Sequence, residues 1–316
     1  LKHCLPQASA RASACVRGSG PTAHGMPAVR GLGSLAVLAF ARPAFGGHVP
    51  SYESSGFAFP LPILSSSEVA RARSHFQEIE AREPDGRFRV QTLNYHLSDP
   101  ALWELATHPE ILRQAQRFTG TAPEDLRVLA TTIFCKYPTT NATAAVVGWH
   151  QDLTYWTLHP EKAWTLWMAI DEATSENGAL QYAAGMHTGG RLRHIQDRHD
   201  KTSALMARQR IADGLVNYDK AIQTELRPGE AVFHHGWTPH FSGPNYSKNR
   251  RLAFVVNFIP AATRLLPFHY KDDAEWRKPV MLNDTFPPAV IEFAEQPTIA
   301  DTLSCAERTT IADAAS

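Results

Sequence analysis

The sequence predicts a mainly β protein with flanking helices, in which two sheets form a double-sheet barrel of jelly-roll type. Two helical stretches come first, and several short β-rich stretches separated by turn signals follow them. This order favours two packed sheets with helices at one side. The composition, 43% apolar and 20% charged over 316 residues, is that of an ordinary globular protein.

The helices are predicted from caps and apolar spacing. Ser65 and Glu68 have the spacing of a capping box, and apolar residues recur at helical spacing through 68–82. A second helical stretch opens at Asp99-Pro100, can break at His108-Pro109, and stops at Gly120.

The strands are predicted from β-branched and aromatic residues. Turn signals such as Asn177-Gly178 and Gly243-Pro244-Asn245 separate them. The polar stretch 194–213 is interpreted as an insertion that is helical in part. The predicted strands are 127–136, 164–170, 221–226, 231–234 and 252–259.

Residues 1–50 differ from the rest of the chain. No Asp or Glu occurs from Leu1 to Tyr52, whereas five residues there are basic. The stretch is interpreted as a leader, a transit-like segment, or translated sequence upstream of a true start at Met26; the alternative is a disordered extension. Its apolar run, 35–40, also fits a secretory signal or an organelle presequence. We expect one domain over 51–316, with its core at about 63–260.

The charge balance and the cysteine content limit which partners and which cellular location are expected. Lys+Arg and Asp+Glu both number 31, which gives no reason to expect nucleic acid as a partner. No apolar run is long enough for a membrane span. The four cysteines show neither disulfide nor zinc spacing, so an intracellular, cytoplasmic location is expected. A small-molecule substrate is the expected partner, and no oligomeric state is predicted.

The strongest chemical signal is the segment 148–153, Gly-Trp-His-Gln-Asp-Leu. Side chains alternate along an extended strand, so His150 and Asp152 are expected on one face. Together they can bind one metal ion, with a third ligand from elsewhere. Two histidines and one carboxylate on one face of iron(II) leave three positions open. A lone H-x-D triplet, however, is more often a surface hydrogen-bonding pair.

The downstream segment 229–254 can supply what is missing. It combines a strand, a histidine-bearing turn and a further strand that begins at an arginine. His234, His235 and His240 are candidates for the third ligand. Of Arg250 and Arg251 only one can face inward on a strand. Arginine suits the far carboxylate of a dicarboxylic co-substrate, because its planar fork makes two parallel hydrogen bonds.

The chain resembles the phytanoyl-CoA dioxygenase family. Four pieces occur in family order within about Ile63 to Pro260: W-H-Q-D-L-T-Y-W, W-M-A-I-D-E-A-T-S-E-N-G-A-L, R-P-G-E and P-H-F-S-G-P-N-Y-S-K-N-R-R. The resemblance implies a double-stranded β-helix, cupin-like core, with Fe(II) as cofactor and 2-oxoglutarate and O2 as co-substrates. The chain departs from the family at 184–187, where Ala-Gly-Met-His replaces P-G-S-H in a loop that borders the substrate mouth.

The resemblance also implies roles for individual residues. His240 is favoured as the third ligand because the S-G-x-N context follows it, and Arg250 is assigned to solvent. Tyr155 and Trp156 are expected either to wall the site or to be core aromatics. The implied metal ligands are His150, Asp152 and His240; Arg251 pairs with the co-substrate, and Ser242, Lys136 and Trp167 are further contacts in its pocket.

The implied activity is that of an Fe(II)- and 2-oxoglutarate-dependent dioxygenase. It would hydroxylate an unactivated C–H bond of a small or mid-sized metabolite and release succinate and CO2. Two alternatives remain: a non-catalytic cupin-like metal-binding protein, and a 2-oxoglutarate-dependent halogenase, which Asp152 disfavours. No basic patch for coenzyme A phosphates is evident, so an acyl-CoA substrate is not predicted.

Overall fold

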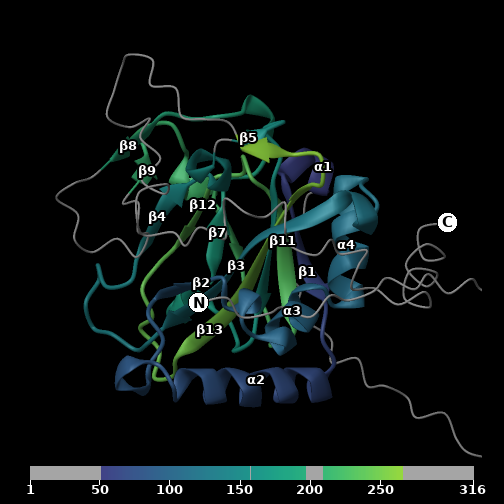
Figure 1. Ribbon diagram of the computed structural model, residues 1–316. Coiled ribbons are helices and arrows are strands. Elements are labelled where there is room, and N and C mark those ends of the chain that lie inside the picture. Colours follow the sequence, from purple (N-terminus) through teal and green to yellow (C-terminus); the bar gives the residue numbers. More distant parts are fainter. Residues whose placement is uncertain (1–50, 157, 197–208, 266–316) are drawn as a thin grey trace, which may run out of the picture. The chain divides into compact units, whose positions relative to one another are not determined.

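The computed structural model describes residues 51–156, 158–196 and 209–265 (Figure 1). The leader predicted for 1–50 lies outside these residues. Within the described ranges, no helix combines the length and the apolar character that a membrane crossing requires.

The helices form where their caps predicted them. Ser65 caps α2 in a reciprocal capping box with Glu68, and the buried side of the helix carries Phe76 and Ile79. The break at His108-Pro109 is confirmed, since it separates α3 from α4, and Gly120 ends α4 with a φ of 65°. The α-helices are α1 Tyr52–Ser55, α2 Ser66–Glu80, α3 Pro100–Ala106 and α4 Pro109–Thr119.

Short 3-10 helices occupy many of the turns between the strands. One of them, η4, matters for the site because it begins at Asp152. They are η1 Pro84–Gly86, η2 Tyr95–Leu97, η3 Pro123–Asp125, η4 Asp152–Tyr155, η5 Ser175–Asn177, η6 Met186–Gly189 and η7 Tyr218–Lys220.

The predicted jelly-roll core is confirmed as two antiparallel sheets. The larger has the strand order β1-β11-β6-β13-β3-β2, and the smaller β10-β7-β12-β4. The larger sheet contains β1 Phe57–Pro62, β11 Glu230–His235, β6 Trp164–Ala169, β13 Arg251–Pro260, β3 Leu126–Lys136 and β2 Gln91–Leu93. The smaller contains β10 Ile222–Thr224, β7 Leu180–Tyr182, β12 His240–Ser242 and β4 Val147–His150.

Two further strand pairs complete the described fold. β5 Leu158–His159 pairs with β14 Arg264–Leu265, and β8 His194–Gln196 pairs with β9 Gln209–Ile211. The second pair places strands at the two described ends of the stretch 194–213, which was predicted to be an insertion that is helical in part. Residues 197–208 lie outside the described part of the chain.

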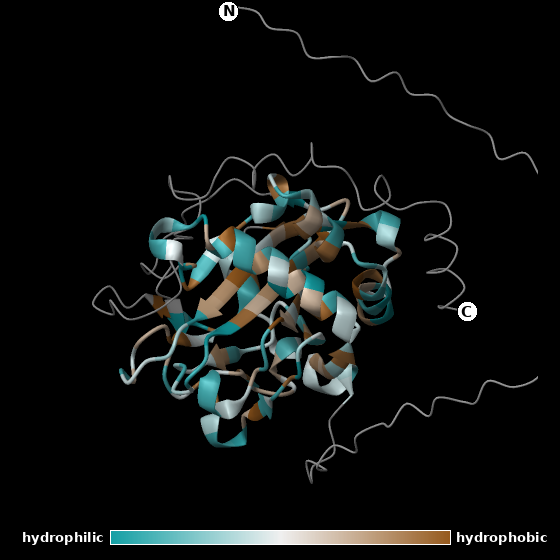
Figure 2. Cartoon of the chain, turned by 90° about the horizontal axis from the view of Figure 1, so that it is seen from below, coloured by the Kyte–Doolittle hydropathy of each residue, from teal (hydrophilic) through white to brown (hydrophobic). Residues whose placement is uncertain are grey.

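The two faces of the larger sheet have different neighbours. Leu166 and Met168 of β6 and Phe254 of β13 pack in one apolar cluster with residues of α2, α3 and α4. Trp167 and Val255, which alternate with them, pack towards the smaller sheet with Leu180 of β7. The helices lie towards the bottom and right of Figure 1, and β4 and β12 towards the upper left. In Figure 2 the central strands are coloured largely as apolar residues. The space between the sheets is where the polar site residues are found.

Candidate active site

Two histidines face each other across neighbouring strands of the smaller sheet. His150 ends β4 and His240 begins β12, and these residues are direct partners in the antiparallel register. Their ring centroids lie 4.0 Å apart. Both side chains are buried. The two predicted histidine ligands are therefore neighbours by strand pairing, although 90 residues separate them in sequence.

Backbone carbonyls fix the orientation of both imidazoles. Nδ1 of His150 lies 2.8 Å from the carbonyl of Gly148, and Nδ1 of His240 lies 3.0 Å from that of Thr238. A carbonyl only accepts, so in each neutral ring Nδ1 carries the proton and Nε2 carries the lone pair. Burial holds the pKa of His240 well below its usual value, which keeps that ring neutral.

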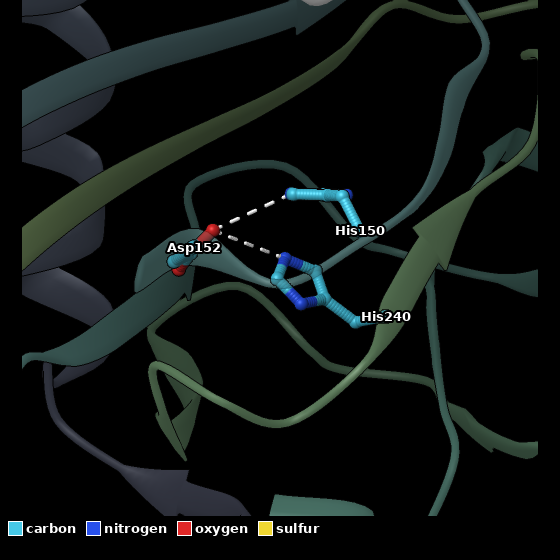
Figure 3. A group of neighbouring side chains, drawn as sticks. All are labelled: His150, Asp152 and His240. Atoms are coloured by element: carbon cyan, nitrogen blue, oxygen red, sulfur yellow. Dashed lines mark ion pairs between the residues drawn. The ribbon is translucent and has the colours of Figure 1, made fainter. Parts of the chain in front are cut away.

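Asp152 completes the group from a turn. β4 ends at His150, and Asp152 is the first residue of η4, so the prediction that both lie on one strand is corrected. Extended Gln151 between them still brings the two side chains to one side. Oδ1 of Asp152 lies 3.4 Å from Nε2 of His150 and 3.6 Å from Nε2 of His240 (Figure 3).

The charge state of this group suits a divalent cation. Burial alone would raise the pKa of Asp152, but the imidazoles of His240, His150 and His234 hold it well below its usual value. The carboxylate and the two imidazoles each offer one ligand atom, and these atoms all lie within 4.8 Å of one another. Two histidines and one carboxylate on one face are the ligand set of non-haem iron(II) oxygenases.

Arg251 contributes a buried cation, two of whose nitrogens have no hydrogen-bond partner among the described residues. The residue is 1% exposed, and among the described residues its Nε and Nη1 have no hydrogen-bond partner. Its guanidinium lies 5.1 Å from the ring centroid of Trp167, and both residues line the cavity that contains the triad. Burial lowers the pKa of Arg251 to about 10. An unpaired buried charge is costly, so this position favours an anionic ligand.

Lys136 and Ser242 lie beside Arg251. Lys136 is its cross-strand partner on β3 and is fully buried. Its Nζ donates to Ser242 Oγ at 2.6 Å and to the carbonyl of Gly243 at 2.5 Å. Ser242 Oγ in turn donates to the carbonyl of Gly178 at 2.7 Å. Ser242 lines the cavity, whereas Lys136 lies behind it.

Arg250 does not point into solvent as predicted. Its Nη1 forms an ion pair with Glu80 of α2, and its Nε lies 3.4 Å from Asp171. Arg250 therefore binds to the helical side of the molecule, while the next residue, Arg251, points between the sheets. The inward assignment of Arg251 agrees with this arrangement.

His234 and Thr165 also belong to the site. From the sequence His234 was only an alternative for the third ligand, and Thr165 was assigned no role. Nε2 of His234 lies 3.0 Å from Oδ2 of Asp152, and Thr165 Oγ1 donates to the same oxygen at 2.6 Å. His235 points elsewhere, where its Nδ1 accepts from the backbone N–H of Trp237. The sequence contained one signal for an inward-facing histidine here: His234 and His235 are consecutive on a strand, so only one of them can face inward.

Apolar and aromatic side chains wall most of the cavity. Tyr155 and Trp156 line it, as expected, together with Leu93, Phe134 and Val255. Of the described residues that line the cavity, none comes from the 184–187 loop, which the resemblance had placed at the substrate mouth.

The fold and this site define an oxygenase of the 2-His-1-carboxylate class. Residues 52–253 match the family model of phytanoyl-CoA dioxygenase, PhyH, and the chain belongs to that family. A probable phytanoyl-CoA dioxygenase of Caenorhabditis elegans is 24% identical over 231 residues, which cover 66% of this chain and 72% of the relative. The protein is an oxygenase that depends on iron and 2-oxoglutarate and reacts with O2.

Two solved structures share the fold. The crystal structure of EvdO2 from Micromonospora carbonacea var. aurantiaca complexed with 2-oxoglutarate matches with a TM-score of 0.56 and 26% identity, over 73% of this chain and 96% of that chain. The epimerase SnoN in complex with Fe³⁺, alpha ketoglutarate and nogalamycin RO matches with a TM-score of 0.55 and 22% identity, over 68% and 83% of the two chains.

Proposed function

We propose that this oxygenase hydroxylates an unactivated C–H bond of a small or mid-sized metabolite. In the balanced reaction the substrate, 2-oxoglutarate and O2 give the hydroxylated substrate, succinate and CO2. The cavity supports this proposal, because apolar and aromatic walls lie directly beside the triad. Such walls hold a substrate carbon near the metal and keep bulk water away.

The proposed iron ligands are His150, Asp152 and His240. Bound iron(II) supplies O2 activation coupled to the oxidative decarboxylation of 2-oxoglutarate. The protein supplies the rest: the carbonyls of Gly148 and Thr238 orient the imidazoles, and burial keeps His240 unprotonated. Iron(II) held by these three residues would keep positions free for the co-substrate and O2.

Arg251 is the proposed anchor of 2-oxoglutarate. Its guanidinium would form two charge-assisted hydrogen bonds with the carboxylate far from the iron. Trp167 packs beside that guanidinium and Ser242 lines the same end of the cavity. Lys136 lies behind Ser242 and donates to its hydroxyl oxygen. Direct contact between Ser242 and the co-substrate would require its hydroxyl to release Gly178.

One observation carries this proposal: a buried, unpaired arginine and a convergent His-Asp-His group line the same cavity. A metal site alone would fit a cupin-like binding protein. The additional buried cation has no structural counterion among the described residues within hydrogen-bonding distance of Nε or Nη1. That arrangement favours a catalyst with a dicarboxylate co-substrate over a protein that only binds metal.

Other outcomes of the same chemistry remain as alternatives. A halogenase would carry a small residue in place of Asp152, so its carboxylate disfavours that alternative. SnoN, which shares the fold, is an epimerase. Product analysis distinguishes these outcomes: a hydroxylase adds one oxygen atom from O2 to its substrate, a halogenase requires chloride, and an epimerase leaves the substrate mass unchanged.

The test begins with an anaerobic titration of the apo-protein by iron(II) and then by 2-oxoglutarate. We expect the weak visible charge-transfer band only after both additions. Candidate metabolites are then screened for substrate-stimulated succinate formation, with isotopically labelled O2 and mass spectrometry of the product. Absence of the band with folded protein would favour the non-catalytic alternative. Succinate coupled to an unoxygenated product would contradict hydroxylation.

A further inference from the structure

The active site consists of two rows of side chains, one on each sheet. On the smaller sheet Tyr182, His240 and His150 occupy paired positions on β7, β12 and β4. On the larger sheet His234, Thr165 and Asn257 occupy paired positions on β11, β6 and β13. Asp152 belongs to neither row, since it lies on η4.

The larger-sheet row holds one oxygen of the Asp152 carboxylate. Oδ2 accepts from Thr165 Oγ1 at 2.6 Å and lies 3.0 Å from Nε2 of His234. A carboxylate only accepts, so this Nε2 carries a proton. With both donors on Oδ2, the other oxygen, Oδ1, faces the two histidines of the smaller sheet.

Both donors are themselves fixed by a further residue. Asn257 Nδ2 donates to Thr165 Oγ1 at 2.9 Å, which leaves the hydroxyl proton directed at Asp152. The hydroxyl of Tyr182 lies 2.9 Å from Nδ1 of His234 and donates to it when the ring is neutral. All four residues are buried, so water does not compete for these bonds.

We propose that Thr165 and His234 are positioning residues that restrict Asp152 to a single-oxygen metal ligand. This inference rests on the proposed iron ligands. The turn that carries Asp152 cannot orient the carboxylate by strand pairing, so the opposite sheet does so. A carboxylate free to rotate could offer both oxygens to the metal and occupy a position that 2-oxoglutarate or O2 needs. Outer partners of this kind typically change metal affinity about 10–100-fold.

The test compares matched variants by anaerobic titration with iron(II) alone and then with 2-oxoglutarate. Thr165→Val removes the hydroxyl with little change of shape, and Thr165→Ser restores it. His234→Leu removes the donor, and His234→Gln supplies an amide N–H instead. We expect Thr165→Val and His234→Leu each to weaken iron(II) binding by about 10–100-fold. Even when saturated with iron they should give a weaker charge-transfer band, whereas the Ser and Gln variants stay close to wild type.

The control is Thr131→Val on β3. Thr131 is also buried, and its Oγ1 lies 2.8 Å from Nδ1 of His96. The hydrogen bonds to Asp152 Oδ2 come from Thr165 and His234 instead. This variant should lose stability and keep iron affinity. The inference is overturned if folded Thr165→Val and His234→Leu bind iron(II) like wild type, or if the Ser and Gln variants fail equally. Failure of wild type itself to bind iron(II) would overturn the proposed function, and this inference with it.

Discussion

Arg251 and Lys136 are cross-strand partners on β13 and β3, so two basic side chains lie side by side in the protein interior. Burial and the neighbouring Arg251 hold the pKa of Lys136 well below its usual value. Lys136 has three oxygen acceptors, on Ser242 and Gly243, whereas two nitrogens of Arg251 have none among the described residues. An incoming carboxylate would therefore pair with the guanidinium of Arg251, whose pKa of about 10 keeps it charged at neutral pH.

Arg251→Met should weaken 2-oxoglutarate binding by about 2–5 kcal/mol, because it removes the partner of a desolvated carboxylate. Iron(II) binding should persist, since Arg251 is not a ligand. The apo variant should also be at least as stable as wild type, because a buried unpaired charge is replaced by an apolar side chain. Titration calorimetry with 2-oxoglutarate and thermal unfolding check these expectations. Unchanged co-substrate affinity would move the anchor to another residue.

Arg250→Met is the matched variant for the neighbouring position. It breaks the ion pairs with Glu80 and Asp171, so the free energy of unfolding should fall by about 1–2 kcal/mol. The dependence of succinate formation on 2-oxoglutarate concentration should not change. Urea unfolding and steady-state kinetics measure the two effects separately. A large rise in the 2-oxoglutarate KM would show that the two arginines have been assigned the wrong way round.

Asp152→Ala should abolish both iron(II) retention and succinate formation, because it removes the one anionic ligand of the triad. The exposed Asp219 on η7 provides a control, since Asp219→Ala removes a carboxylate outside the site. Anaerobic iron titration and succinate assays of both variants give the comparison. Normal turnover by Asp152→Ala would refute the ligand assignment.

His96 makes stability depend on acid pH. Burial lowers the pKa of His96 to about 4, so between its folded pKa and the unfolded value near 6.5 the unfolded chain binds more protons. The stability it contributes is therefore present above about pH 6.5 and is lost as pH falls towards 4. Linkage predicts a loss of roughly 2 kcal/mol between pH 7 and pH 5.

The check is chemical unfolding of wild type and His96→Leu at those two pH values. The difference between the two pH values should shrink by about that amount in the variant. Because His96 lies against Trp103 and Thr131, the variant also changes packing at both pH values, and only the pH-dependent part tests the prediction. An identical pH dependence in both proteins would mean that His96 is not the group responsible.

Local signals predicted the helices and the grouping of His150 with Asp152, whereas the family resemblance selected His240 as the third ligand. The Ser65 capping box and Gly120 act within a few residues, so the boundaries of α2 and α4 could be read directly. The short strands of the smaller sheet were harder to predict from the sequence. β7 and β12 have only three residues each, and they are strands only because they pair with neighbouring strands. The strand pairing at the described ends of 194–213 was not predicted, because the polar composition gave no sign of it.

The remainder of the site depends on contacts between distant residues. Arg250 was assigned to solvent because nothing nearby in sequence could pair with it, whereas Glu80 lies 170 positions away. His234 was considered only as a rival ligand, because its bond to Asp152 spans 82 positions and joins the larger sheet to η4. A single sequence contains the alternation that turns His234 inward, but it does not identify the group that His234 meets.

The opposite directions of Arg250 and Arg251 make the site sensitive to chain length. β13 pairs with β3 and β6, and insertion of a single residue before Arg251 could shift its alternation against both neighbours. The anchoring guanidinium would then turn towards α2, and the residue that binds Glu80 would turn into the cavity. Natural variation in the turn 243–250 should therefore consist of substitutions, or of insertions and deletions that keep Arg251 facing the cavity, such as changes by two residues.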